Sequence, residues 1–190
     1  MAVLNPADDA GCVECRGRQL YFDRCRALAL YEGALRRMVL LHKYRGSIQV
    51  RDWLVKALAD FLRDEEDGSD LFDMPVLVPV PSHPLRTFLR GRDSLWELAE
   101  ELSLAVDLEL LPALQRRRFT RSQTRLTRGR RMCNPRGSFC IRRGFDVPER
   151  VLLLDDVATT CATVSEAARV LRLAGARSVE VLVLARSLSR

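Results

Sequence analysis

The segment Val151–Thr163, with the sequence VLLLDDVATTCAT, constrains the fold of this chain more than any other. It begins with a continuous apolar run from Val151 to Leu154, which is typical of a central strand covered on both faces. Asp155 and Asp156 then fall at the carboxyl end of this strand. Ligands of open α/β sheets bind at that end of the strands. The segment therefore predicts a parallel sheet with a ligand site at its edge.

A hydroxyl-rich loop follows the two acids. Thr159, Thr160 and Thr163 lie in a short loop that opens a helix continuing through Ala174. Backbone N–H groups and hydroxyls at the start of a helix suit a phosphate group. The pattern is thus typical of a sugar-phosphate site, and an ordinary strand and capped helix with surface acids is the alternative. The G-x-G-x-x-G motif of dinucleotide folds and the P-loop are both absent from the sequence.

This segment resembles the signature of type I phosphoribosyltransferases that binds phosphoribosyl pyrophosphate (PRPP). The resemblance implies that Asp155 and Asp156 hold the ribose hydroxyls, with Mg²⁺ accompanying the pyrophosphate. It also implies a loop around the 5-phosphate made of Ala158, Thr159, Thr160, Cys161, Ala162 and Thr163. Cys161 departs from the family, which usually has glycine there. Glycine allows positive φ and close backbone approach, so this position bears on whether the protein is an active enzyme.

Composition indicates a globular protein with one core. The chain has 190 residues, of which 47% are hydrophobic and 29% charged, and this leaves room for one sizeable domain and a small appendage. No apolar run approaches the roughly 20 residues that span a bilayer. The N-terminus has neither a basic start nor an apolar h-region. We therefore expect a cytoplasmic location, where the six cysteines are mostly reduced.

The pattern along the chain predicts two parts, a cysteine-containing segment over 1–27 and a phosphoribosyltransferase-like domain over 28–190. Residues up to about 26 are expected to be irregular. Apolar spacing predicts two helices around 35–41 and 53–62 and another over Ser94–Leu104. Strands are expected over Met74–Val80, as the first core strand, and Val179–Ala185, with an acidic linker at Glu65–Asp73 and a helix C-cap at Gly175. Alternating strands and helices favour a mostly parallel α/β sheet.

Positive charge is concentrated in a basic block over 115–143. The formal net charge is +6, and no acidic residue occurs between Leu110 and Phe145. Such a block favours polyanions such as pyrophosphate or nucleic acid. We expect an exposed loop or hairpin, which either closes over a substrate or contacts single-stranded DNA with Phe119 for stacking. A solvated run of charges is the plain alternative.

Further motifs resemble the ComF family of competence-associated proteins. They are LYEG with LR at 30–36, KYRG at 43–46, VPVP with HP at 78–84, RG at 90–91, and the spaced residues Arg118, Thr120, Gln123, Arg131, Asn134, Gly137 and Phe139. Together they cover most of residues 28–186. The resemblance implies a type I phosphoribosyltransferase fold with a short zinc-ribbon-like N-terminal segment, and a link to DNA uptake in natural competence.

The same resemblance implies two more parts of the site. A pyrophosphate loop after the strand at Met74–Val80 is expected to use Ser82, His83, Arg86 and Arg90, with Arg92 nearby, although a solvated basic helix start explains these residues equally well. A flexible loop is expected to use Arg118, Thr120 and Gln123.

A zinc site is a further expectation at the N-terminus. Cys12 and Cys15 have the C-x-x-C spacing that lets two thiolates bind one zinc ion, and Cys25 is a third ligand in this interpretation. The ComF family often has four cysteines here, and the fourth is missing, so retention and loss of zinc are both open. Cys133 and Cys140 are interpreted as isolated thiols.

Three functions remain open from the sequence. The first is a ComF-like protein that binds PRPP or a related ribose-phosphate and acts with other competence proteins on incoming DNA. The second is an active phosphoribosyltransferase in nucleotide metabolism, for which no catalytic side chain can be named because catalysis in this fold is mainly positioning and leaving-group stabilisation. The third is a non-catalytic module that binds single-stranded DNA.

Overall fold

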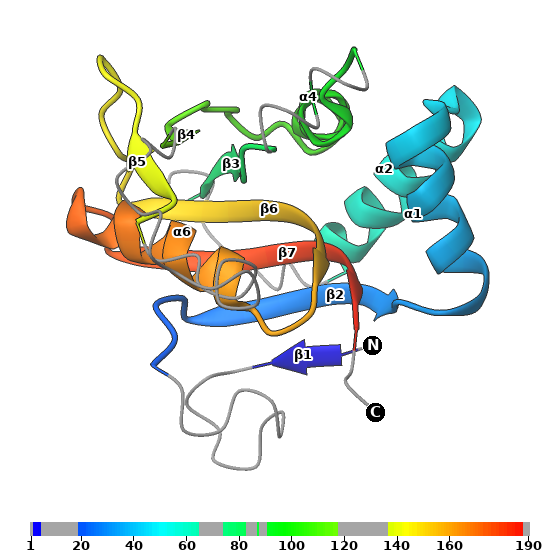
Figure 1. The fold of residues 1–190 in the computed structure, drawn as a ribbon, viewed down its shortest axis with the longest axis horizontal. Helices are drawn as coiled ribbons and strands as arrows, with labels where there is room; N and C mark the ends of the chain where they lie inside the picture. Colours follow the sequence, from blue (N-terminus) through cyan, green and yellow to red (C-terminus); the bar gives the residue numbers. More distant parts are fainter. Residues whose placement is uncertain are drawn as a thin grey trace, which may run out of the picture.

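The central feature of the structure, a computed structural model, is a five-stranded sheet (Figure 1). The structure describes residues 2–4, 19–64, 74–82, 87, 91–117 and 137–187. The strands lie in the order β1-β2-β7-β6-β3, and the four from β2 to β3 are parallel. The predicted α/β fold with a mostly parallel sheet is therefore confirmed. The bounds are β1 Ala2–Leu4, β2 Arg24–Leu30, β3 Val76–Pro79, β6 Arg150–Ala158 and β7 Ser178–Arg186.

The two central strands form the middle of the core. The apolar run Val151–Leu154 of β6 is at most 1% exposed, and the run Val181–Ala185 of β7 is completely buried. The strands pair in register, with Leu154 opposite Leu182 on one side and opposite Pro79 of β3 on the other. Burial on both faces is what a continuous apolar run requires of a parallel strand.

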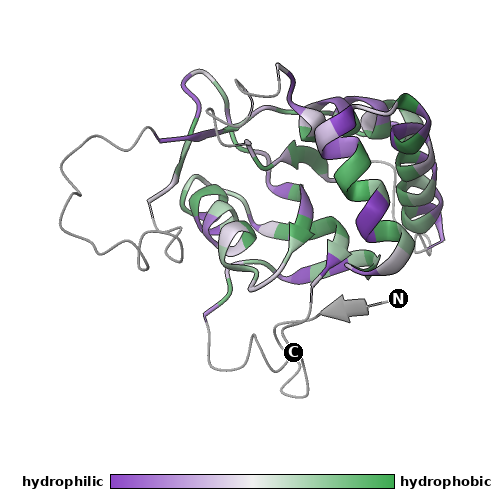
Figure 2. Cartoon of the chain, turned by 45° about the vertical axis from the view of Figure 1, so that its right-hand side comes forward, coloured by the Kyte–Doolittle hydropathy of each residue, from purple (hydrophilic) through white to green (hydrophobic). Residues whose placement is uncertain are grey.

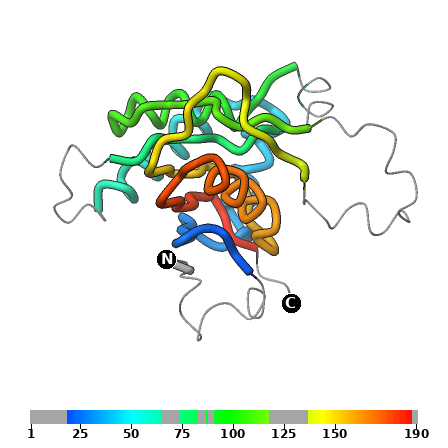
Figure 3. The backbone as a smooth tube through the Cα atoms, turned by 90° about the vertical axis from the view of Figure 1, so that its left-hand side faces the viewer, coloured from blue at the N-terminus to red at the C-terminus, as the bar shows by residue number. Residues whose placement is uncertain are grey.

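Helices cover both faces of the sheet. α1 (Gly33–Arg45), α2 (Ile48–Arg63) and α4 (Ser94–Val106) stand together on one side (Figure 1, Figure 2). α6 (Ala162–Leu173), orange in Figure 3, covers the other side. The connection from β2 to β3 runs along the sheet in the opposite direction to that from β6 to β7, so right-handed crossovers place their helices on opposite faces. All of the predicted helices are present.

β2 corrects two expectations. Residues 24–30 are a strand inside the sheet, parallel to β7, so the chain from 24 onward is not irregular and Met74–Val80 is not the first core strand. The predicted boundary after residue 27 falls within this strand. Cys25 and Ala27 are buried, but the alternating Arg26, only 9% exposed, forms an ion pair with Glu180 at 2.8 Å. Charged residues in the strand hid it from a search for apolar runs.

The end of α6 also differs from its prediction by one residue. Ala174 is the C-cap, and Gly175 follows it with φ +116°. The N–H of Gly175 donates to the carbonyl of Arg172 and that of Ala176 to Leu171, each at 3.1 Å. This is the double hydrogen bond of a Schellman motif, in which glycine stands one residue beyond the cap.

The two ends of the basic block form a hairpin. β4 (Leu114–Arg116) pairs antiparallel with β5 (Phe139–Ile141). The predicted loop or hairpin is thus confirmed at its ends, while 118–136 lie outside the described residues. None of the helices among the described residues has the length and apolar character needed to cross a membrane.

Candidate functional site

The paired acids lie within β6 and not after it. β6 continues through Asp155 and Asp156 to Ala158, four residues further than its apolar run. β7 pairs with β6 over this extension, as far as Ala158 opposite Arg186. β3 does not, because its register with β6 ends at Leu154 and the last backbone hydrogen bond is from Val80 to Leu154 at 2.8 Å. The acids therefore lie where the edge of β6 is no longer paired with β3.

The two carboxylates have different surroundings. Asp156 forms an ion pair with Lys43, with 2.6 Å between Oδ2 and Nζ. The Oδ1 atom of Asp155 accepts a hydrogen bond from the backbone N–H of Asp156 at 2.8 Å. Burial and the neighbouring charge of Asp156 raise the pKa of Asp155 to about 7, against the opposing effect of Lys43 and Arg116. The carboxyl of Asp155 is therefore readily protonated at neutral pH.

Lys43 is a site residue that the sequence analysis did not identify. It lies in the last turn of α1, which ends at Gly46 in the left-handed conformation with φ +63°. Its side chain is only 19% exposed and reaches Asp156, 113 residues later in the chain by their numbers. Two features of the sequence could have indicated Lys43 as a site residue. It lies in the KYRG motif, and it is one of only two lysines in the sequence, the other being Lys56.

The predicted phosphate loop connects β6 to α6. Thr159 and Thr160 are exposed, Cys161 precedes the first helical residue, and Thr163 is half-buried in the first turn. The first N–H groups of an α-helix have no partner within the helix, so they are directed at whatever lies before its N-terminus. The loop thus brings hydroxyls and a helix N-terminus to the same end of the sheet as the acids.

Cys161 has a left-handed backbone conformation, which glycine adopts most readily. Its φ is +55° and its ψ is 6°, in the left-handed region. Its side chain is 3% exposed, and its sulfur accepts a hydrogen bond from the guanidinium of Arg186, which is 1% exposed at the end of β7. The cysteine therefore turns inward, and the left-handed backbone of the loop is kept.

The turn after β3 contains one described side chain of the predicted pyrophosphate loop. Ser82 Oγ donates to Asp93 Oδ1 at 2.9 Å. Arg92 is directed elsewhere, because it forms an ion pair with Glu97 of α4 and lowers the pKa of that carboxyl. His83, Arg86 and Arg90 lie outside the described residues.

Arg116 is a second cation near the acids. From the sequence it was a member of the basic block and was not predicted as a site residue. Its Nε donates to the carbonyl of Pro81 at 2.8 Å, and its guanidinium lies 4.8 Å from the ring centroid of Phe139. It is also close enough to Asp155 to lower the pKa of that carboxyl. Arg116 therefore lies between the turn after β3 and the acids of β6.

The other predicted residues are those of the flexible loop and the cysteines. Arg118, Thr120, Gln123, Cys12, Cys15 and Cys133 lie outside the described residues. Cys25 is buried in the core within β2, and no group of three metal-binding side chains occurs in the described part of the chain. Cys140 accepts a hydrogen bond from Gln115 at 3.4 Å.

Comparison with solved structures finds partial likenesses to a PRPP amidotransferase and to a hypoxanthine phosphoribosyl transferase. A PRPP amidotransferase from B. subtilis matches 76% of this chain at 21% identity with a TM-score of 0.48, and this chain spans only 30% of its length. A hypoxanthine phosphoribosyl transferase from Trypanosoma cruzi matches 80% of this chain at 13% identity with a TM-score of 0.40, and 66% of that chain is covered. These partial likenesses concern the fold alone.

Comparison with curated proteins is more specific. No protein-family model matches the chain. Competence protein F of Haemophilus influenzae is 26% identical over 179 residues, which are 93% of this chain and 78% of that protein. Competence protein ComFC of Streptococcus pneumoniae is 29% identical over 161 residues, which are 85% of this chain and 67% of that protein. Over most of its length the chain is therefore similar to ComF-type competence proteins, as its motifs predicted.

Proposed function

We propose that this protein binds PRPP or a related ribose-phosphate, together with Mg²⁺, and that it acts in the uptake of DNA during competence. The observation that carries the proposal is the arrangement at the end of β6. Two adjacent acids, beyond the last residue paired with β3, are followed by a left-handed turn and the N-terminus of α6. Hydrogen-bond acceptors for hydroxyls and donors for a phosphate thus follow one another within nine residues, over 155–163.

Each part of the ligand has a partner in this arrangement. The carboxylates of Asp155 and Asp156 accept hydrogen bonds from the ribose hydroxyls. The 5-phosphate lies against the first turn of α6, where backbone N–H groups and the hydroxyl of Thr163 donate. The pyrophosphate extends toward the turn after β3, where Arg116 and Ser82 supply a positive charge and a hydroxyl.

The carboxylate oxygens near the ribose are also suitable ligands for Mg²⁺. This ion prefers oxygen ligands and keeps several waters, so it needs only one or two carboxylates from the protein beside the ligand's own phosphates. Asp155 and Asp156 supply these oxygens. Lys43 balances the charge of Asp156 at 2.6 Å. When the cation and the ligand bind, Lys43 is expected to leave Asp156 and pair with a phosphate.

Calorimetric titration with PRPP in the presence of Mg²⁺ tests the proposal. We expect saturable binding by the wild type and at least about tenfold weaker binding by Asp155→Asn and by Asp156→Asn, since each removes a charged acceptor. Asp60→Asn, an exposed acid on α2 with a side chain 55% exposed, is the matched control and should bind as the wild type does. Absence of binding by the wild type would refute the proposal.

Catalysis is a second candidate function, and the conformation of Cys161 favours it. A side chain at this position was expected to interfere with a glycine conformation, yet φ is +55° and the thiol points into the core. An active phosphoribosyltransferase would release pyrophosphate from PRPP when a nitrogenous base is supplied. Assay of pyrophosphate release across purine and pyrimidine bases tests this, and no release with any of them would exclude it for that panel.

Binding of single-stranded DNA is favoured by exposed cations on the hairpin. Arg117 follows β4 and Arg143 follows β5, and both are exposed. Phosphate contacts of this kind release counterions, so affinity would fall steeply as salt increases. Fluorescence anisotropy with a labelled oligonucleotide at several salt concentrations tests this function. Binding that is absent, or insensitive to salt, would contradict it.

A further inference from the structure

A pocket opens beside the end of β3, on the edge away from β6. Leu77 pairs on this edge with the segment before β4, since its N–H donates to Glu109 at 2.8 Å and its carbonyl accepts from Leu111 at 2.9 Å. The next residue facing this edge is Pro79, which has no N–H to continue the pairing. Pro112 stands at the corresponding place in the other segment. The two segments therefore separate, and a pocket of about 240 Å³ lies between them and the start of α4.

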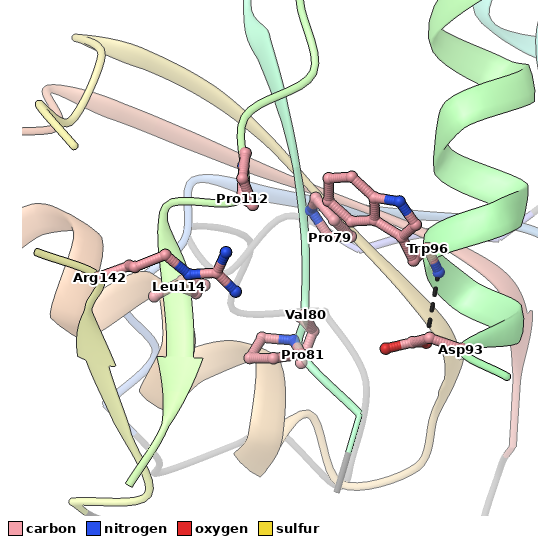
Figure 4. Close-up of a pocket in the computed structure, with 8 residues that line it drawn as sticks. All are labelled: Pro79, Val80, Pro81, Asp93, Trp96, Pro112, Leu114 and Arg142. Carbon is pink, nitrogen blue, oxygen red and sulfur yellow. Dashed lines mark hydrogen bonds between the residues drawn. The ribbon is translucent and has the colours of Figure 1, made fainter. Parts of the chain in front are cut away.

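Most of the residues that line this pocket are apolar, and three of them are prolines. Pro79, Pro81 and Pro112 line it, and their rings fix the backbone φ around it. The indole of Trp96 faces it from α4 (Figure 4). The polar edge of that indole is already used, because Nε1 donates to Glu100 Oε1 at 2.6 Å. A flat apolar group in the pocket would thus contact the indole ring and the proline rings. It would not cover an unpaired N–H of the indole, because that N–H is bonded to Glu100.

One positive charge faces the pocket from the opposite side. The side chain of Arg142, just after β5, reaches toward the interior from the wall across from Trp96 (Figure 4). Arg142 is exposed and forms no ion pair with any described residue. The other charged residue, Asp93, accepts hydrogen bonds from Ser82 Oγ at 2.9 Å and from the N–H of Trp96 at 3.4 Å. Arg142 is therefore the one cation among the residues that line the pocket, and it lies on the wall across from Asp93 (Figure 4).

We propose that this pocket is a second ligand site, distinct from the acids of β6, for a small molecule with a flat aromatic body and one anionic group. The body lies between the indole of Trp96 and the prolines, and the anion pairs with Arg142. A cavity of about 150 Å³ takes up benzene, so 240 Å³ holds one ring with its substituents. The pocket also shares Pro81 and Asp93 with the turn that carries Ser82, so its occupant contacts the wall of that turn.

Tryptophan fluorescence measures occupancy directly. The chain has two tryptophans, and Trp53 is exposed on α2. The full chain with Trp53→Phe therefore reports on Trp96 alone. Titration with benzoate should change the emission saturably. Benzyl alcohol, which lacks the anion, and acetate, which lacks the ring, should each bind at least about tenfold more weakly.

Two arginine variants in the Trp53→Phe background locate the anion contact. Arg142→Gln should weaken benzoate binding at least about tenfold, whereas Arg143→Gln, its exposed neighbour, should leave it unchanged. The double variant Asp155→Asn/Asp156→Asn should retain benzoate binding, which separates this site from the PRPP site. No saturable change with benzoate, equal binding of acetate, or equal effects of the two arginine variants would overturn the proposal.

Discussion

At the scale of single residues, the two neighbouring aspartates differ in their surroundings. Asp156 forms an ion pair with Lys43, whereas burial and the adjacent charge raise the pKa of Asp155 to about 7. A carboxyl that must be ionised to hold Mg²⁺ or hydroxyls is then about tenfold less ionised at pH 6 than at pH 8. The proton on Asp155 thus competes with the ligand.

The first prediction concerns this proton. PRPP binding in Mg²⁺, measured by calorimetry, should be about tenfold weaker at pH 6 than at pH 8 in the wild type. Asp155→Asn has no such proton, so its weaker binding should depend on pH only through the phosphates of the ligand itself. An equal pH dependence in both proteins would show that Asp155 does not titrate in this range.

The second prediction concerns Cys161. Its left-handed backbone disfavours β-branched side chains most and glycine least. Denaturant unfolding should therefore show Cys161→Val to be less stable than Cys161→Gly by about 1 kcal/mol or more. Both variants remove the buried thiol that accepts a hydrogen bond from Arg186, and glycine leaves the larger cavity, so this order would not follow from the loss of buried contacts. If the glycine variant were the less stable of the two, the loop would not have the conformation described.

At the scale of secondary-structure elements, a buried histidine joins two helices. His42 of α1 is 1% exposed, and its Nε2 lies 2.8 Å from the carbonyl of Ser94 at the start of α4. Burial lowers the pKa of His42 below its usual 6.5, and the nearby Arg92 acts in the same direction. The folded protein therefore holds this histidine neutral where the unfolded chain would protonate it.

The third prediction follows from the sign of that shift. Below pH 6.5 the unfolded chain binds a proton that folded His42 does not, so His42 contributes a fall in the free energy of unfolding as pH decreases from 7 to 5. Asp155, whose raised pKa makes the folded protein take up a proton in this range, contributes a rise, so the contribution of His42 is the difference between the wild type and His42→Gln. His42→Gln should lose less stability over this range in denaturant titrations. His83→Gln, which replaces the other histidine of the chain, is the control. A wild-type slope identical to that of His42→Gln would contradict the assignment.

A buried carboxylate connects α6 to the hairpin. Glu166 is 4% exposed, accepts a hydrogen bond from the N–H of Gly137 at 2.6 Å, and pairs with Arg169 at 2.8 Å. The end of the basic block is thus fixed to the helix that follows the phosphate loop.

The fourth prediction compares this carboxylate with an exposed one. Glu166→Gln should lower the free energy of unfolding by about 1–3 kcal/mol, because it weakens charged hydrogen bonds in a buried place. Glu149→Gln removes the ion pair with Arg177, whose side chain is 78% exposed, and should cost less than about 1 kcal/mol. Equal losses in urea titrations would show that Glu166 does not connect the two elements.

The elements also show what the sequence could predict. β6, β7 and the helices have apolar patterns that follow from local burial, and these were predicted within a few residues. β2 was not predicted, because its arginines alternate with small residues. Arg26 is buried in an ion pair with Glu180, which lies on another strand. The ion pair of Lys43 with Asp156 was not predicted for the same reason. It depends on how α1 packs against the sheet.

At the scale of the whole molecule, the sheet brings the two halves of the site together. β2, α1 and β3 supply Lys43 and the turn at Ser82, whereas β6 and α6 supply the acids and the phosphate loop. The direction of the connections along the sheet reverses between these halves, and ligands of open α/β folds bind at such a reversal. The acids and the loop were identified from the sequence because they are contiguous in it. The cations were not, because they arrive from distant elements.

The most direct test of this site is a titration of PRPP into the protein at pH 8 with Mg²⁺, for the wild type and the double variant Asp155→Asn/Asp156→Asn. The wild type should bind one equivalent of PRPP, and the double variant, with both charged acceptors removed, should show no detectable binding while remaining folded by circular dichroism. A wild type that does not bind, or a folded double variant that binds equally well, would contradict the proposal that the acids of β6 form a ribose-phosphate site.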